Sequence, residues 1–131
     1  NSIVAPQTPE WASVGRASAN ATFTTAPTNT ALLVTAGPNG ARVTRLWAVP
    51  LEQINAANNI QLYRSQDGGT TKFLADSKLM GTINPGAAVA NAPTDFGYSD
   101  DNPLILTANE RIYMAEGQTE AVNVIAEWAD Y

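Results

Sequence analysis

Acidic side chains gather in the stretch from residue 94 to 102, and carboxylates near one another can bind a hard cation. Asp95, Asp100 and Asp101 lie there, with the amide oxygen of Asn102 beside them. Calcium takes about six to eight oxygen ligands from carboxylates and carbonyls, so these three acids are the candidate calcium ligands. Their spacing matches no calcium-loop template, and acids in loops are typically solvated turn residues. We therefore expect no bound metal.

Catalytic chemistry has few residues to use in this sequence. It contains no His and no Cys, which excludes Ser–His triads, thiol nucleophiles and zinc sites of the cysteine type. Ser77 lies beside Lys78 and near Lys72, a chemically possible Ser–Lys pair, but no G-x-S-x-G nucleophile motif is present. No glycine-rich loop opens a helix to hold a phosphate. We predict a protein that is not an enzyme and has no cofactor.

Residues 65–71, SQDGGTT, match the pattern S-x-D-x-G-x-T. This pattern resembles the Asp-box of sialidases and related β-propellers, in which the Ser and Asp side chains hold a hairpin turn through hydrogen bonds to the backbone. A propeller needs several blade repeats, and this chain carries one copy of the motif. The motif therefore predicts a self-capped hairpin without a catalytic role.

These residues must be positioned by short strands, because Gly and Pro interrupt the chain too often for long helices. Between the interruptions lie runs rich in Val, Ile, Leu, Thr and aromatic residues, which favour strands. The predicted strands cover residues 11–17, 30–35, 42–49, 59–65, 72–80, 104–106, 111–115 and 121–128. This spacing predicts an all-β fold, a two-sheet antiparallel sandwich or jelly roll of about eight strands.

Alternating side chains indicate which residues face the core. Period two is typical of strands, and it predicts one core containing Trp47, Leu62, Ile112, Val124 and Trp128. In the run 42–49 neither alternating face is purely polar, so this strand is either covered on both sides or part of an interface.

Two stretches break the strand rhythm. Residues 1–10 hold Pro6 and Pro9 among small polar residues, which predicts an extended N-terminal arm, followed by a single domain over 11–131. We expect the arm, with Pro6, Pro9 and Trp11, to bind a partner or a neighbouring subunit more than it supports the fold. Residues 83–103 form a long irregular connection with three prolines, a kind of loop that is usually functional or mobile.

The charge and hydropathy of the chain exclude several partners. Its 131 residues hold seven Lys and Arg against twelve Asp and Glu, a formal charge of −5. A nucleic acid or an anionic membrane would call for a basic surface, so neither is expected. No apolar run approaches the ~20 residues that span a bilayer, and the first residues lack the features of a signal peptide.

Four stretches from Gly40 onward form a recognisable pattern: GARVTRL at 40–46 with Pro50, QLYRSQDGGTTK at 61–72, TDFGYSDDNPLIL at 94–106, and AEWADY at 126–131. In these stretches the chain resembles a group of small virion proteins of tailed bacteriophages. The resemblance implies a structural role in the virion, namely decoration or cementing of the capsid surface, and it assigns no site residues. The partners it implies are the major capsid protein of the phage head and further copies of the same chain.

The alternative is a tail-associated or receptor-binding domain that grips carbohydrate with its end loops or the 83–103 loop. Aromatic side chains together on loop tips would favour this alternative. An apolar strip along a sheet face or along the arm would favour assembly.

Overall fold

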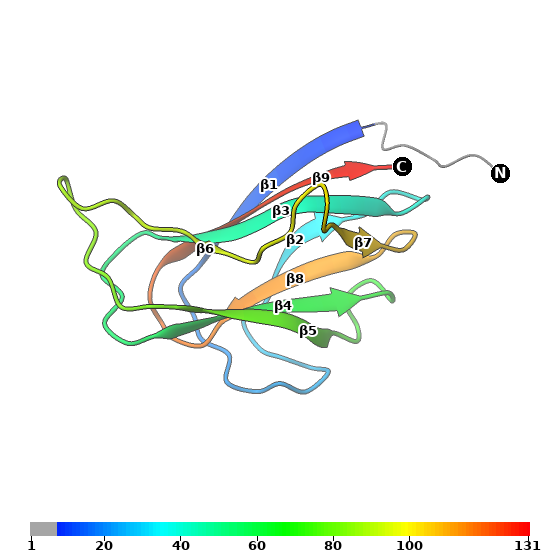
Figure 1. Cartoon of the computed structure of the whole chain (residues 1–131). Coiled ribbons are helices and arrows are strands. Elements are labelled where there is room, and N and C mark those ends of the chain that lie inside the picture. The colour runs from blue at the N-terminus through cyan, green and yellow to red at the C-terminus, as the bar shows by residue number, and fades with distance from the viewer. Residues whose placement is uncertain (1–7) are drawn as a thin grey trace.

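The computed structural model describes residues 8–131, which fold into two antiparallel sheets packed face to face (Figure 1). The first sheet has the order β1–β9–β3, and β6 and β7 both pair with the far side of β3. Its strands are β1 (Thr8–Arg16), β3 (Ala41–Pro50), β6 (Thr94–Asp95), β7 (Leu104–Leu106) and β9 (Val122–Asp130). The second sheet has the order β2–β8–β4–β5 and consists of β2 (Ala31–Thr35), β4 (Asn58–Ser65), β5 (Phe73–Met80) and β8 (Arg111–Glu116). The prediction of an all-β sandwich is confirmed, with nine strands.

Apolar side chains from both sheets meet between the layers and form one core. Leu62, Ile112 and Val124 are fully buried, and Trp128 is 8% exposed, as predicted. Alternation places these side chains inward, because successive residues of a strand point to opposite faces. Within residues 8–131 no helix is present that could cross a membrane.

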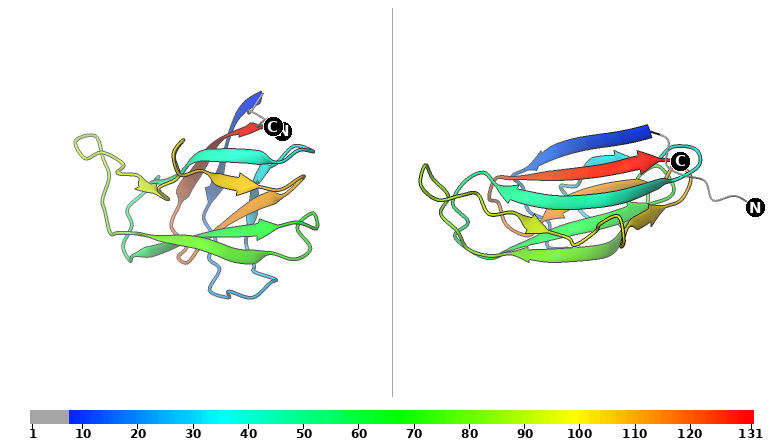
Figure 2. Two further views of the ribbon diagram at one scale, coloured as in Figure 1. Left: turned by 45° about the vertical axis from the view of Figure 1, so that its right-hand side comes forward. Right: turned by 45° about the horizontal axis from the view of Figure 1, so that its top comes forward.

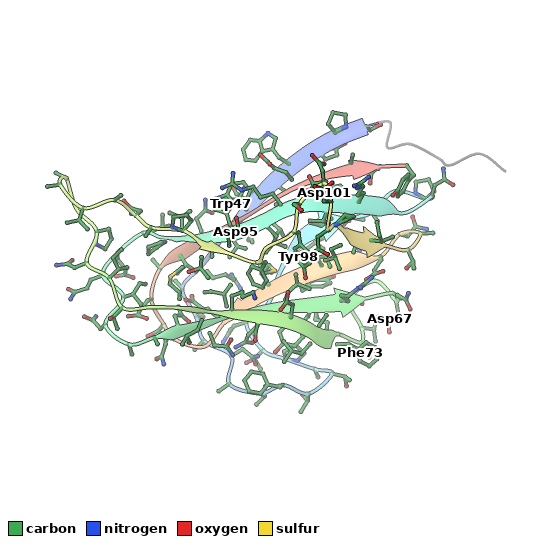
Figure 3. The ribbon with its side chains drawn as sticks, viewed as in Figure 1. Trp47, Asp67, Phe73, Asp95, Tyr98 and Asp101 are labelled. Carbon is green, nitrogen blue, oxygen red and sulfur yellow. The ribbon has the colours of Figure 1, made fainter. Side chains whose placement is uncertain are left out.

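Trp47 is not part of this core, and that prediction is wrong. A bulge in β3 between Val43 and Arg45 sets two residues against one of β9. Alternation changes phase at the bulge, so that Val43 is buried before it and Leu46 after it. Trp47 therefore lies on the outer face of the first sheet, only partly buried (Figure 3).

The segment 17–30 covers the outer face of the second sheet, below β4 and β8 in Figure 1. Asn20 is buried there, and its side-chain amide donates to Gln61 Oε1 and Tyr63 OH, both at 2.9 Å. Gln61 and Tyr63 belong to the outer face of β4, yet both are fully buried. Polar side chains can be buried here because each finds a hydrogen-bond partner in the covering segment.

The connection 83–103 is more ordered than predicted, since it contains the unpredicted strand β6 and is attached on both sides. Phe96 is buried in the core, and Tyr98 OH donates to Asp76 Oδ2 of β5 at 2.7 Å. The part between Ile83 and β6 extends away from the sandwich, with a turn closed by Gly86 and Val89 (Figure 1).

The predicted boundary of the N-terminal arm at residue 10 is wrong. β1 begins at Thr8, so Pro9 and Glu10 pair with β9 in the same register as Trp11. The cause lies in the tertiary structure: β9 offers a full-length neighbour, and proline is tolerated on an edge strand. Pro6 lies outside the described residues.

The hairpin between β4 and β5 has the predicted self-capped turn. Ser65 Oγ donates to Asp67 Oδ1 at 2.9 Å, and the same Asp67 oxygen accepts from the Thr71 N–H at 2.8 Å. These bonds favour the charged carboxylate, and the Thr71 N–H contributes most to lowering the pKa of Asp67. Gly69 has a φ of +97°, and a Cβ there would lie 2.2 Å from Tyr113 OH, so this position requires glycine.

Candidate protein-binding site

The three candidate calcium ligands do not form a cation site in the structure. Asp95 accepts from the Gly97 N–H at 2.8 Å and faces Arg45 (Figure 3). Asp100 and Asp101 lie in the turn before β7, where Arg42 donates to the backbone oxygen of Asp100. Nowhere in residues 8–131 do three acidic side chains come close enough to hold a metal ion.

We expect removal of divalent cations to leave the fold unchanged. The acids of the 94–102 stretch are held by protein donors or face solvent, so no ligand set would be lost. Thermal unfolding with and without a chelator measures this, and the two melting temperatures should agree within about 1 °C. A fall of ~10 °C on chelation, which corresponds to one to a few kcal/mol, would contradict the prediction.

The Ser–Lys combination is also not assembled as a catalytic pair. Lys72 Nζ donates to Gly69 O at 2.8 Å and lies 4.7 Å from the centre of the Tyr113 ring. Ser77 and Lys78 are exposed neighbours on β5, whose side chains point to opposite faces. Lys72 therefore supports the hairpin turn.

The outer face of the first sheet carries the most distinctive group of side chains, which we call the tryptophan face. Cross-strand pairing places Trp11 opposite Glu127, and Trp47 between Ile125 and Asp95. Residues paired across neighbouring strands share a face. The tryptophan face consists of Trp11, Arg45, Trp47, Val49, Asp95, Ile125 and Glu127.

Arg45 contacts the ring of Trp47 on the tryptophan face. Its guanidinium carbon is 3.8 Å from the centre of the Trp47 ring, a cation–π distance. Its Nε is 3.9 Å from Asp95 Oδ2, and Glu127 is its cross-strand partner on the other side. Both members of the Arg45–Asp95 pair are nearly half exposed, so this pair contributes little to folding. Arg45 and Glu127 lie in the same cross-strand row as Trp11, so charged and aromatic side chains alternate on this face.

No described segment crosses the tryptophan face, whereas the outer face of the second sheet is covered by residues 17–30 (Figure 2). Trp11 is 71% exposed on this bare surface. Water contact with an indole ring is unfavourable, and each Trp can bury roughly 150–250 Å². Trp and Arg are also the residue types most enriched where partner proteins bind tightly. The surface therefore has the chemistry of a protein interface.

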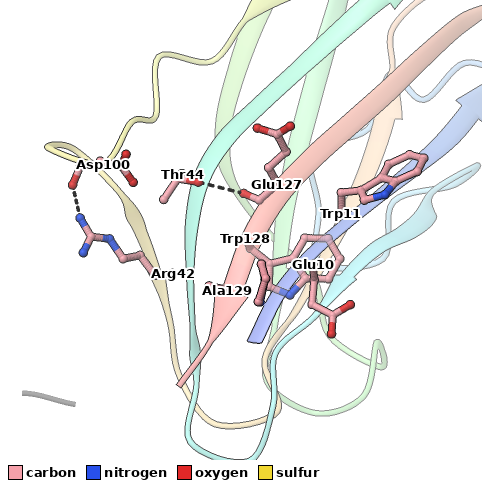
Figure 4. A pocket seen from close by; sticks show the side chains of 9 residues that line it. Glu10, Trp11, Arg42, Thr44, Asp100, Glu127, Trp128 and Ala129 are labelled. Atoms are coloured by element: carbon pink, nitrogen blue, oxygen red, sulfur yellow. Dashed lines mark hydrogen bonds between the residues drawn. The ribbon is translucent and has the colours of Figure 1, made fainter. Parts of the chain in front are cut away.

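A hollow of about 710 Å³ continues the tryptophan face toward the start of β1 (Figure 4). Pro9 and Trp11 line one side of it, and Arg42 and Thr44 line the other. Arg42 Nε is buried there without a hydrogen-bond partner.

Comparison with known proteins gives no relative. The sequence matches no protein-family model, and no curated protein or solved structure shows significant similarity to it. Residues 8–131 form a two-sheet antiparallel β-sandwich, in which a described segment covers the outer face of the second sheet and none covers that of the first.

The sequence pattern pointed to part of this site. The sequence predicts Trp11 as a partner-binding residue, and Trp11 is the most exposed of the large apolar side chains in residues 8–131. For Trp47 the alternation predicts a place in the core, which the bulge in β3 contradicts. The run 42–49 nevertheless carried a signal, because neither of its alternating faces was purely polar and an interface could account for this.

Proposed function

We propose that this protein is a non-enzymatic structural protein of a phage virion, which decorates or cements the capsid surface. The tryptophan face carries this proposal, because Trp11 and Trp47 lie on the outer face of a sheet and not together on loop tips. The resemblance of residues 40–131 to small virion proteins supports the same role. The proposed main partner is the major capsid protein, and the proposed location is the virion surface.

The carbohydrate-binding alternative finds less support. The aromatic residues of the 83–103 loop are Phe96, which is buried in the core, and Tyr98, whose hydroxyl bonds to Asp76. The extended part of that loop, residues 84–93, contains no aromatic residue. Glycan recognition by stacking would need exposed rings there.

The direct test is sedimentation of the purified protein with isolated phage heads and, separately, with tails. We expect saturable binding to heads, and we expect Trp47→Ala and Trp11→Ala each to weaken it at least about tenfold, since truncating a central interface residue typically costs about 2 kcal/mol or more. Phe73→Ala is the matched control, because Phe73 is a 59% exposed aromatic residue on the other sheet. It should bind as the wild type does.

The outcomes separate the two functions. Binding to tails or to host glycans with no binding to heads would support the receptor-binding alternative and contradict decoration. Wild-type affinity of both Trp variants for heads, with Phe73→Ala impaired, would place the interface on the second sheet. Melting temperatures of all three variants show whether each is folded.

A further inference from the structure

β1 is the one long, regular edge strand in the part of the chain that the structure describes. All nine of its residues pair with β9 in a single unbroken register, and no described residue pairs with its other side. β5, one of the two edge strands of the second sheet, has a bulge, and its Asp76 accepts a hydrogen bond from Tyr98 of the connection 83–103. β2 is short and bulged, and β6 and β7 have two and three residues. A regular edge of this kind is a template for another strand.

The hydrogen bonds of β9 show which peptide groups of β1 face this open edge. Tyr131 donates its N–H to Gly40 O, and Ala121 accepts from the Leu51 N–H, so odd-numbered residues of β9 bond toward β3. Peptide groups alternate in direction along an antiparallel strand, so even-numbered residues of β9 bond toward β1. Their partners in β1 are the even-numbered residues.

The odd-numbered residues of β1 therefore direct their peptide groups outward. Proline at such a position loses no bond to β9, which explains how Pro9 fits into the strand. Three N–H donors remain on the open edge. The outward-facing residues are Pro9, Trp11, Ser13 and Gly15.

We infer that two copies of this chain pair through β1 in antiparallel orientation, with the two-fold axis at Ser13. This register pairs all three outward donors: Ser13 bonds to Ser13 of the partner subunit, and Trp11 bonds to Gly15 of the partner subunit. An axis at Ala12 or Val14 would place opposite each other peptide groups that already bond to β9. An axis at Trp11 or Gly15 would leave fewer residues of the two β1 strands paired with each other.

The side chains of β1 are complementary in this register. Glu10 lies opposite Arg16 of the partner subunit, and opposite charges that face each other across strands are favourable. Arg16 uses Nε on Gly15 O and Nη1 on Asn29 O, which leaves Nη2 for a carboxylate. Parallel pairing would instead set Glu10 against a second Glu10.

Trp11 gains a specific neighbour as well. In this register the exposed indole of Trp11 lies opposite Gly15 of the partner subunit, on the outer face that the first sheets of the two copies share. A large ring can lie over a glycine of the next strand and cover its bare backbone. The dimer thereby sets the tryptophan faces of two copies side by side, facing the same way. This inference rests on the proposed function, because a protein that assembles on a capsid is expected to bind further copies of itself, and the inference names a second copy as the partner of β1.

A cysteine at the axis tests the pairing without any capsid. The chain has no Cys, so Ser13→Cys introduces a single thiol that meets its own copy at about 5.5 Å between Cα atoms, within disulfide range. Under mild oxidation we expect most of the Ser13→Cys protein to form a covalent dimer. Ser77→Cys is the matched control, because Ser77 is also exposed on an edge strand, and it should stay mainly monomeric.

A charge exchange tests the register. Sedimentation equilibrium of the wild type should give twice the 13.8 kDa of one chain. Glu10→Arg should weaken dimerisation at least about tenfold, and the double variant Glu10→Arg with Arg16→Glu should restore it, because the opposite charges face each other again. Ser13→Pro should give a folded monomer, since the Ser13 N–H makes no bond to β9, and its thermal unfolding shows whether it is folded.

The inference is overturned if the wild type sediments as a monomer at all concentrations and Ser13→Cys cross-links no more than Ser77→Cys. It is equally overturned if a dimer forms but tolerates both Glu10→Arg and Ser13→Pro. Head binding of the monomeric Ser13→Pro variant is measured separately. Failure of dimerisation with intact head binding refutes this pairing alone, and intact dimerisation without head binding refutes the proposed function alone.

Discussion

Asn20→Ala is expected to lower the free energy of unfolding by about 4 kcal/mol. The Asn20 amide donates to Gln61 Oε1, Tyr63 OH and Thr22 O within 2.9 Å. Its Oδ1 accepts from the Thr28 N–H at 3.0 Å. Truncation removes one of the two side-chain partners of Gln61 Oε1 and of Tyr63 OH, which keep only their mutual side-chain bond at 2.9 Å, and it removes the acceptor of the Thr28 N–H. Each buried polar group left without a partner costs roughly 1–3 kcal/mol. It also releases the segment that covers the second sheet.

Urea unfolding of the variant measures this loss. Asn20→Asp keeps the acceptor but removes the donor, so it should also destabilise the protein. Asn91→Ala is the matched control, because Asn91 is an exposed Asn with one bond, to Pro50 O at 2.7 Å. It should cost less than about 1 kcal/mol. A loss below 1 kcal/mol in Asn20→Ala would show that the covering segment does not depend on this residue.

The stability of the protein is expected to fall as the pH rises from about 5 to 8. Glu116 is fully buried, and burial raises its pKa from 4.5 to about 7. Only one of its oxygens has a partner, the Asn58 amide at 2.7 Å. Between pH 4.5 and 7 the unfolded chain loses the Glu116 proton and the folded chain keeps it. The free energy of unfolding therefore falls through this pH window, by about 3 kcal/mol in total, and becomes constant above pH 7.

Glu116→Gln isolates this effect. The amide keeps an acceptor for Asn58 and carries no charge, so the variant should be more stable than the wild type by about 2–3 kcal/mol at pH 8 and similar to it at pH 4.5. Glu127→Gln, an exposed carboxylate, should leave the pH profile unchanged. Wild-type stability that stays flat or rises between pH 5 and 8 in denaturant titrations would rule out a protonated Glu116.

Features that depend on neighbouring residues in the chain could be predicted from the sequence. The turn at Ser65–Thr71 is an example, because Ser65 and Asp67 bond to groups at most four residues away. The strands were predictable for a similar reason, since alternation of apolar residues is a local pattern with one preferred geometry. Leu62 and Val124 follow that pattern without interruption and are buried as expected.

Features that depend on pairing between distant segments were decided by the tertiary structure. β9 pairs with β3 both before and after the bulge that lies between Val43 and Arg45. The bulge shifts the alternation of the β3 side chains by one residue, and this shift turns Trp47 outward. Asn20 is buried because Gln61 and Tyr63, more than forty residues away, supply its partners. The pattern of the run 42–49 indicated a strand that is either covered on both sides or part of an interface. In the structure the core covers the inner face of β3, and the segment 17–30 docks on the outer face of the other sheet, so that no described segment covers the outer face of β3.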